Sequence, residues 1–148
     1  MHSTKFNQTL WQRCDTLYEK LQPLCLELQD QHGVCVNLLL LAYYLDERAM
    51  GFNLQQWQQL HQQVSQWEEK LLLPYRRLRR LGKSHLSEDE YQQMLGLELR
   101  LERQSQRRIL SQINEMNELN VGGNLGLYLS LFNLNQSQFS QLNITVAA

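Results

Sequence analysis

A group of polar and acidic side chains surrounds Gly33 and is the first candidate for chemistry. Its members are Glu27, Gln29, Asp30, His32 and Asn37. Carboxylates and an imidazole can exchange protons and amides can orient a ligand, so the group could line a small-ligand-binding or enzymatic pocket. The alternative is structural: Gln29 and Asp30 bond to the turn backbone and to Asn37, and fix how two helices meet. We favour the structural role and expect Asn37 to be buried.

The cysteines and a nearby histidine could be considered as metal ligands. The chain has three cysteines, at positions 14, 25 and 35, and His32 stands between the last two. Their spacing matches no common zinc pattern, and cysteines on an apolar helical face are usually core residues. We therefore expect no metal and no other cofactor. The odd number of cysteines is typical of reduced thiols in a cytoplasmic protein.

Two arginine-rich segments could bind an anion such as a phosphate or a nucleic acid. The candidate anion-binding residues are Arg76, Arg79, Arg80, Arg103 and Arg107. Nucleic acid is disfavoured because no aromatic residues for base stacking are interleaved with the arginines. We expect internal salt bridges instead, with Glu68, Glu69 and the acidic run 88–90 as the nearest acids. Weak nucleic-acid or phosphate binding stays a third hypothesis for function.

No segment carries a recognised catalytic motif. The sequence has no nucleophile elbow, no HExxH zinc motif and no glycine-rich phosphate loop. We name no catalytic residue and favour a non-enzymatic function.

Size and composition predict one helical domain. The chain has 148 residues, a formal net charge of −1, only 7 glycines and 2 prolines. Such a length fits one domain spanning 1–148, and the abundance of Leu and Gln favours helices over strands. An apolar block at 38–45 is too short to span a membrane, and the first residues lack a signal core. We expect a cytoplasmic protein.

Apolar spacing and capping residues predict an all-α fold of about six helices. The expected helices cover about 4–21, 24–31, 34–50, 53–81, 87–120 and 124–133. Pro23 suits the first turn of a separate second helix, and Pro74 either starts a new helix or kinks the fourth. Ser87 and Glu90 form a capping box that opens one long helix. The polar tail from about 135 is expected to be loosely held.

A narrow apolar stripe carries two tryptophans and could serve as an interface. Trp57, Leu60, Val64 and Trp67 repeat by three and four residues, like one seam of a coiled coil. We expect this seam to pack against the long helix of the same chain. A homodimer, or a seam that faces an unknown protein partner, stays open.

Three segments of the chain together carry a resemblance to a known family. Cys25–Asp30, Gly33 and Val36–Leu40 follow the pattern CLxLQDxxGxxVNLLL. Pro74–Leu81 is similar to P-x-R-x-LRR-x-L, with Tyr75 where some members carry an aliphatic residue, and Asn124–Leu129 follows NLxLYL. The chain resembles a family of short bacterial proteins of unknown function. The resemblance implies a single all-α domain and draws attention to Gln29, Asp30 and Asn37. It transfers no activity, so a cytosolic binding or interaction protein is our leading hypothesis.

Overall fold

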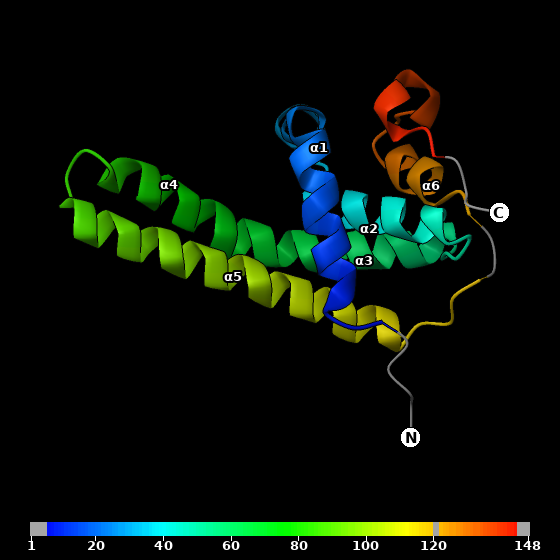
Figure 1. The fold of residues 1–148 in the computed structure, drawn as a ribbon, viewed down its shortest axis with the longest axis horizontal. Helices are drawn as coiled ribbons and strands as arrows, with labels where there is room; N and C mark the ends of the chain where they lie inside the picture. Colours follow the sequence, from blue (N-terminus) through cyan, green and yellow to red (C-terminus); the bar gives the residue numbers. More distant parts are fainter. Residues whose placement is uncertain (1–5, 120–121, 145–148) are drawn as a thin grey trace.

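The computed structural model describes residues 6–119 and 122–144, which fold almost entirely into helices (Figure 1). The α-helices are α1 (Thr9–His32), α2 (Val36–Glu47), α3 (Leu54–Trp67), α4 (Leu73–Gly82), α5 (Glu88–Asn114) and α6 (Asn124–Ser130). A π turn, η1 (Glu68–Leu72), joins α3 to α4, and two 3-10 turns follow α6, η2 (Gln136–Gln138) and η3 (Ser140–Leu142). The all-α prediction with one long helix is confirmed. None of the described helices is long and apolar enough to cross a membrane.

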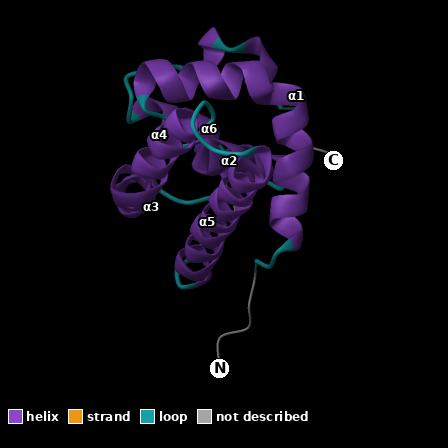
Figure 2. Cartoon of the chain, turned by 90° about the vertical axis from the view of Figure 1, so that its left-hand side faces the viewer, coloured by secondary structure: helices purple, strands orange, loops and turns teal. Residues whose placement is uncertain are grey.

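The first two predicted helices are one helix, so the prediction of a break before Pro23 was wrong. Helix α1 runs through Pro23 and ends at Gly33, whose φ of 73° favours glycine. Proline inside a helix removes one backbone hydrogen bond and clashes with the preceding turn, which bends the helix. Figure 2 shows this sharp bend of α1, whose second half lies across the rest of the molecule. The bend gives α1 two differently directed halves.

Helix α2 lies at the centre of the fold. Its leucines at positions 38, 39, 40, 41 and 45 are each at most 3% exposed. Fully burying one leucine stabilises a fold by about 1.5–3 kcal/mol, so this helix dominates the core. Helices α1 and α6 cover it. The structure therefore agrees with the central position that the apolar composition of this segment predicts.

A π turn separates α3 from α4 just before Pro74. Asn53 caps α3 with its side chain, and Gln56 completes a capping box. The N–H of Leu73 donates to the carbonyl of Glu68, five residues earlier, which is the π pattern. Pro74 has no N–H for the carbonyl of Lys70, so the regular α-helical ladder cannot continue there. The wider turn lets the chain continue as α4 in nearly the same direction (Figure 1).

Helix α4 and the first half of α5 form an arm that extends from the body (Figure 1). Ser87 and Glu90 form the predicted capping box at the start of α5. None of the residues of α4 is buried. Helix α5 ends at Asn114, earlier than predicted, and the Asn114 side chain bonds to the backbone of Phe6. Beyond it, Leu119 forms an isolated antiparallel bridge with Gly51.

The segment after residue 135 contacts the core, although its polar composition predicted a loosely held tail. Turns η2 and η3 place Leu142 at 0% exposure. The side chain of Gln136 donates from Nε2 to the carbonyl of Leu142 at 2.9 Å. Phe139 and Ile144 also pack against the core, so a few apolar side chains attach a segment that is polar on average.

Candidate functional site

Two adjoining cavities lie between the α1–α2 corner and the arm, and together we call them the corner groove. The smaller one, the inner chamber, has a volume of about 180 Å³. The larger one, the outer groove, has a volume of about 660 Å³. Both are lined by Tyr18, Gln29, Glu68, Arg76 and Glu102. The groove therefore joins segments that are far apart in the sequence.

The inner chamber combines an apolar floor with polar walls. Leu40 and Leu72, at 3% and 1% exposure, are its most buried apolar residues. Its remaining lining residues are Asp15, Tyr18, Gln29, Val36, Asn37, Glu68, Arg76, Glu102 and Gln106. Helices α1, α2, α4 and α5 and the π turn all contribute to it. Convergence of several polar groups on a concave surface is typical of a binding site.

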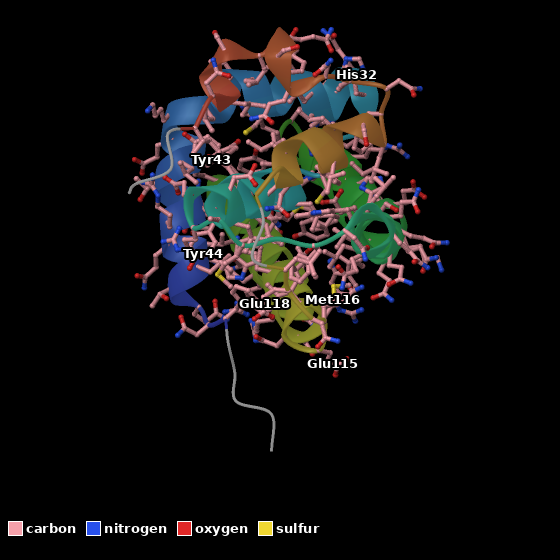
Figure 3. All side chains as sticks on the ribbon, turned by 90° about the vertical axis from the view of Figure 1, so that its right-hand side faces the viewer. His32, Tyr43, Tyr44, Glu115, Met116 and Glu118 are labelled. Carbon is pink, nitrogen blue, oxygen red and sulfur yellow. The ribbon has the colours of Figure 1, made fainter. Side chains whose placement is uncertain are left out.

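The polar group predicted around Gly33 is divided by the structure. Gln29 lines both cavities, Asp30 lines the outer groove and Asn37 lines the inner chamber. The expectation that Asn37 is buried and bonded to the preceding turn was wrong: it is half-buried, and its side chain bonds to none of the described residues. His32 is exposed at the end of α1 (Figure 3) and lines neither cavity.

Glu68 is the acidic residue that the two cavities share at the π turn. Burial raises the pKa of its carboxyl, and the thiol of Cys35 and the charge of Arg76 oppose this effect. The Cys35 thiol donates to Oε1 of Glu68 at 3.4 Å. Arg76 is committed to other acids, so Glu68 has no salt-bridge partner among the residues that the structure describes. A half-buried carboxyl without a cation is costly to ionise.

The arginines of α4 are engaged by α5, as predicted, but with different acids. Arg79 binds Glu98 through two hydrogen bonds, of 2.8 Å from Nε and 3.2 Å from Nη2. Arg76 contacts Glu98 at 3.4 Å and Glu102 at 2.9 Å. Glu98 is 8% exposed, so the network is centred on one buried carboxylate. The acidic run 88–90 forms no ion pair with these arginines in the described chain, and Glu90 serves in the capping box instead.

The other predicted anion-binding arginines are not gathered into one site. Arg103 contacts Asp15 on α1 at 3.4 Å and Gln106 at 3.1 Å, not the expected Glu68 and Glu69. Arg107 is exposed and lines neither cavity. Arg80 lines the outer groove and forms no ion pair with the described part of the chain. The structure brings Arg76, Arg79 and Arg80 to the groove and leaves the other two outside.

The corner groove has an excess of negative charge in spite of its arginines. Its guanidinium groups are those of Arg76, Arg79 and Arg80. Its carboxyl groups are those of Asp15, Asp30, Glu68, Glu69, Glu98 and Glu102. With all six carboxyls ionised, the lining carries three more negative than positive charges. This balance disfavours anions as ligands of the groove.

The three cysteines are free and buried, as expected for core residues. Burial raises the pKa of Cys14 to about 12 and that of Cys25 to about 11. Such thiols stay protonated at neutral pH, so they are poor nucleophiles and poor metal ligands. Within the described residues, no group of three or more His, Cys, Asp or Glu side chains could hold a metal ion.

A hydrogen-bonded chain connects the outer groove to the core. The N–H of Cys35 donates to the hydroxyl of Tyr128 at 3.0 Å, and that hydroxyl lies 2.9 Å from Nδ1 of His61. Since the oxygen of Tyr128 accepts from Cys35, its proton is available for a neutral His61. Burial lowers the pKa of His61, which favours that neutral form. His61 also lines the outer groove.

The two tryptophans proposed as an interface have different surroundings. Trp57 is 0% exposed and packs against Phe52 and Tyr128, with ring centroids 6.1 and 5.5 Å away. The interface hypothesis for Trp57 was therefore wrong, because this side chain is buried within the chain. Trp67 does contact the long helix: the guanidinium carbon of Arg108 lies 4.0 Å above its ring. Its neighbourhood includes a separate surface cavity of about 320 Å³.

Comparison with known proteins identifies the family. Residues 9–109 match the model of a family described as "Protein of unknown function (DUF2390)". The chain belongs to this family. The match covers α1 to most of α5 and thus every element that lines the corner groove. The comparisons with curated proteins and with solved structures found no match.

Several residues of the groove were not recognised as site residues from the sequence. Glu98 and Glu102 were unassigned, and Glu68 was considered only as a salt-bridge partner. The one available signal for Glu68 was the interruption of the helical pattern at Pro74, because the π turn before this proline contains Glu68. Such π turns frequently occur at functional sites. Tyr18 and Gln106 gave no signal, since each is one ordinary residue on a long amphipathic helix.

Proposed function

We propose that this protein is a non-enzymatic interaction module whose corner groove holds a segment of a partner protein. The observation that carries the proposal is the meeting of two distant segments in adjoining cavities. Gln29, Asp30 and Asn37 come from the α1–α2 corner, and the arginines come from α4. Both segments belong to the patterns on which the family resemblance rests. A cytoplasmic location fits the three free, buried cysteines.

Unused hydrogen-bonding groups in the groove support this function. Arg76 and Arg79 are paired with Glu98 and Glu102, so they shape the wall. The side chains of Asp30 and Asn37 have no partner among the described residues. They are free to bond to a ligand without breaking an internal contact. A partner that uses them gains hydrogen bonds at little reorganisation cost, which is the advantage of a preformed site.

Site-specific photocrosslinking tests the proposal. A photoreactive amino acid replaces Asn37 in the groove or, as the matched control, Gln58 on the exposed surface of α3. Irradiation of cells that produce each variant should give a discrete protein adduct from position 37 and not from position 58. Mass spectrometry then identifies the adduct, and Asp30→Ala introduced into the position-37 variant should weaken it. Equal adducts from both positions would contradict the proposal.

A small-ligand-binding or enzymatic pocket is the second candidate function, and Glu68 favours it. A carboxyl with a raised pKa beside a cavity is a common feature of acid–base sites. A thermal-shift screen against a library of metabolites tests this candidate. A compound that stabilises the native chain but not its Glu68→Gln variant would support it.

A further inference from the structure

We propose that the inner chamber is the specificity pocket of the groove and accepts one arginine side chain from the partner. This inference rests on the proposed function and names the chemistry that the partner must present. It concerns a cavity with an apolar floor and acceptor-rich walls, and not merely a cluster of acids.

The size of the chamber matches one long side chain. Its volume of about 180 Å³ lies below the 300–1,000 Å³ of most small-molecule sites. Leu40, Leu72 and Val36 offer apolar contact for the aliphatic part of such a side chain. Arginine and lysine bury their methylene groups against apolar surface in this manner while their charged ends meet polar groups.

The charge of the chamber selects a cation. Asp15, Glu68 and Glu102 line it, against the single guanidinium of Arg76. Arg76 is already held by Glu98 and Glu102, and Arg103 lies beside Asp15. Of these three carboxyls, only Glu68 forms no ion pair within the described structure, and it receives only the weak thiol donor of Cys35. A guanidinium placed in the chamber would supply that missing partner.

The walls favour arginine over lysine. The side chains of Gln29 and Asn37 also line the chamber, and neither forms a hydrogen bond with the described residues. Their amide oxygens can therefore accept from a ligand. A guanidinium has five N–H donors in a planar fork, so it can bond to a carboxylate and to amide oxygens together. Tyr18 also lines the chamber, and an aromatic ring is a surface on which a guanidinium can stack. An ammonium has three donors and no flat face.

Selection from a random dodecapeptide library displayed on phage tests the inference. The immobilised full chain is the target, and Asp30→Ala/Asn37→Ala is the groove variant used for counter-selection. Selected peptides are then synthesised with their arginine unchanged, replaced by lysine, or replaced by citrulline, which keeps the shape without the charge. Fluorescence anisotropy measures the dissociation constant of each peptide.

The expected result is a groove-dependent peptide family with one constant arginine. Citrulline should weaken binding about tenfold or more, and lysine should weaken it less. Glu68→Gln should weaken the arginine peptide by a similar factor and should remove the difference between arginine and citrulline. Glu115→Gln, an exposed acid outside the groove, is the matched control and should change nothing.

Two outcomes would overturn the inference, and they can be told apart. Groove-dependent peptides that lack a basic residue, or that bind equally with citrulline, would refute the arginine pocket and leave the interaction module standing. A selection that yields no peptide sensitive to Asp30→Ala/Asn37→Ala would overturn the proposed function as well. Circular dichroism of each variant confirms that the helical fold is retained in these comparisons.

Discussion

Asp46 binds Asn124 twice, and this pair joins the end of α2 to the start of α6. One carboxylate oxygen of Asp46, Oδ1, accepts from the backbone N–H of Asn124 at 2.8 Å and from its side-chain Nδ2 at 2.7 Å. The other oxygen accepts from the N–H of Leu125 at 3.1 Å. The first N–H groups of a helix have no partner within the helix, so a carboxylate placed there accepts hydrogen bonds from them. Its negative charge also interacts favourably with the positive end of the helix dipole.

Loss of the Asp46 carboxylate should strongly destabilise the fold. Asp46 is 6% exposed, and Asp46→Ala leaves buried donors of Asn124 and Leu125 without an acceptor. Each orphaned donor costs about 1–3 kcal/mol, so we expect a loss of about 3 kcal/mol in the free energy of unfolding. Urea denaturation measures it. Asp15→Ala, which removes an exposed ion pair, should cost less than about 1 kcal/mol; equal losses would argue against the cap.

Trp57 should be essential for stability and irrelevant to association. It is completely buried, and its Nε1 donates to Oδ1 of Asn124 at 3.1 Å. Trp57→Ala should cost about 3–5 kcal/mol through the cavity and the lost hydrogen bond. Sedimentation velocity over a wide concentration range should give the same oligomeric state for the variant and the native chain. A native dimer that becomes a folded monomer on this substitution would restore the interface hypothesis.

The Glu98 carboxylate should hold α4 against α5. Glu98→Gln removes the charge that faces Arg76 and Arg79, whose side chains are 19% and 21% exposed. Hydrogen bonds to charged groups contribute about 1.5–3 kcal/mol, so a loss in that range is expected from chemical denaturation. Hydrogen exchange should accelerate in the arm before the body. Glu115→Gln is the control. An unchanged rate of hydrogen exchange in the arm of the Glu98 variant would contradict this role.

Acidification should destabilise the protein partly through His61. Burial lowers the pKa of His61 in the folded state below its ordinary value near 6.5, so the unfolded chain binds the proton more tightly. The contribution of His61 to stability is therefore complete above about pH 6.5 and is lost as the pH falls through the lower folded pKa. Glu69 opposes the shift by its charge. His61→Gln should lose less stability than the native chain between about pH 7.5 and about pH 5.5; parallel curves would refute this.

The pH dependence of Glu68 should have the opposite sign. Burial raises the pKa of its carboxyl in the folded state, so folding favours the protonated form. Its contribution is complete below the ordinary pKa and is lost as the pH rises through the folded pKa. Glu68→Gln should therefore gain stability relative to the native chain as the pH rises from about 4 to about 7. Thermal denaturation across that range measures the difference in stability. A variant that becomes less stable relative to the native chain as the pH rises would contradict the prediction.

Local signals in the sequence determined most of the helices. Asn53 and Ser87 predicted the starts of α3 and α5, and Gly33 predicted the end of α1. Each signal acts within one turn of helix, through side-chain caps or a positive φ, so it can be recognised without a fold. The apolar segment that became α2 likewise identified the centre of the core.

The tertiary structure alone decided which residues meet. Helical spacing predicts that Trp57 is buried, but not that its ring packs against Tyr128. It also predicts an arginine-rich face on α4, but not that Glu98 and Glu102 lie opposite that face. The corner groove depends on the direction of the bend at Pro23 and on the path of the chain through the π turn. Those directions follow from packing between distant elements, which no local pattern encodes. The sequence by itself therefore determined an all-α protein with a leucine-rich centre, and packing decided where its polar groups converge.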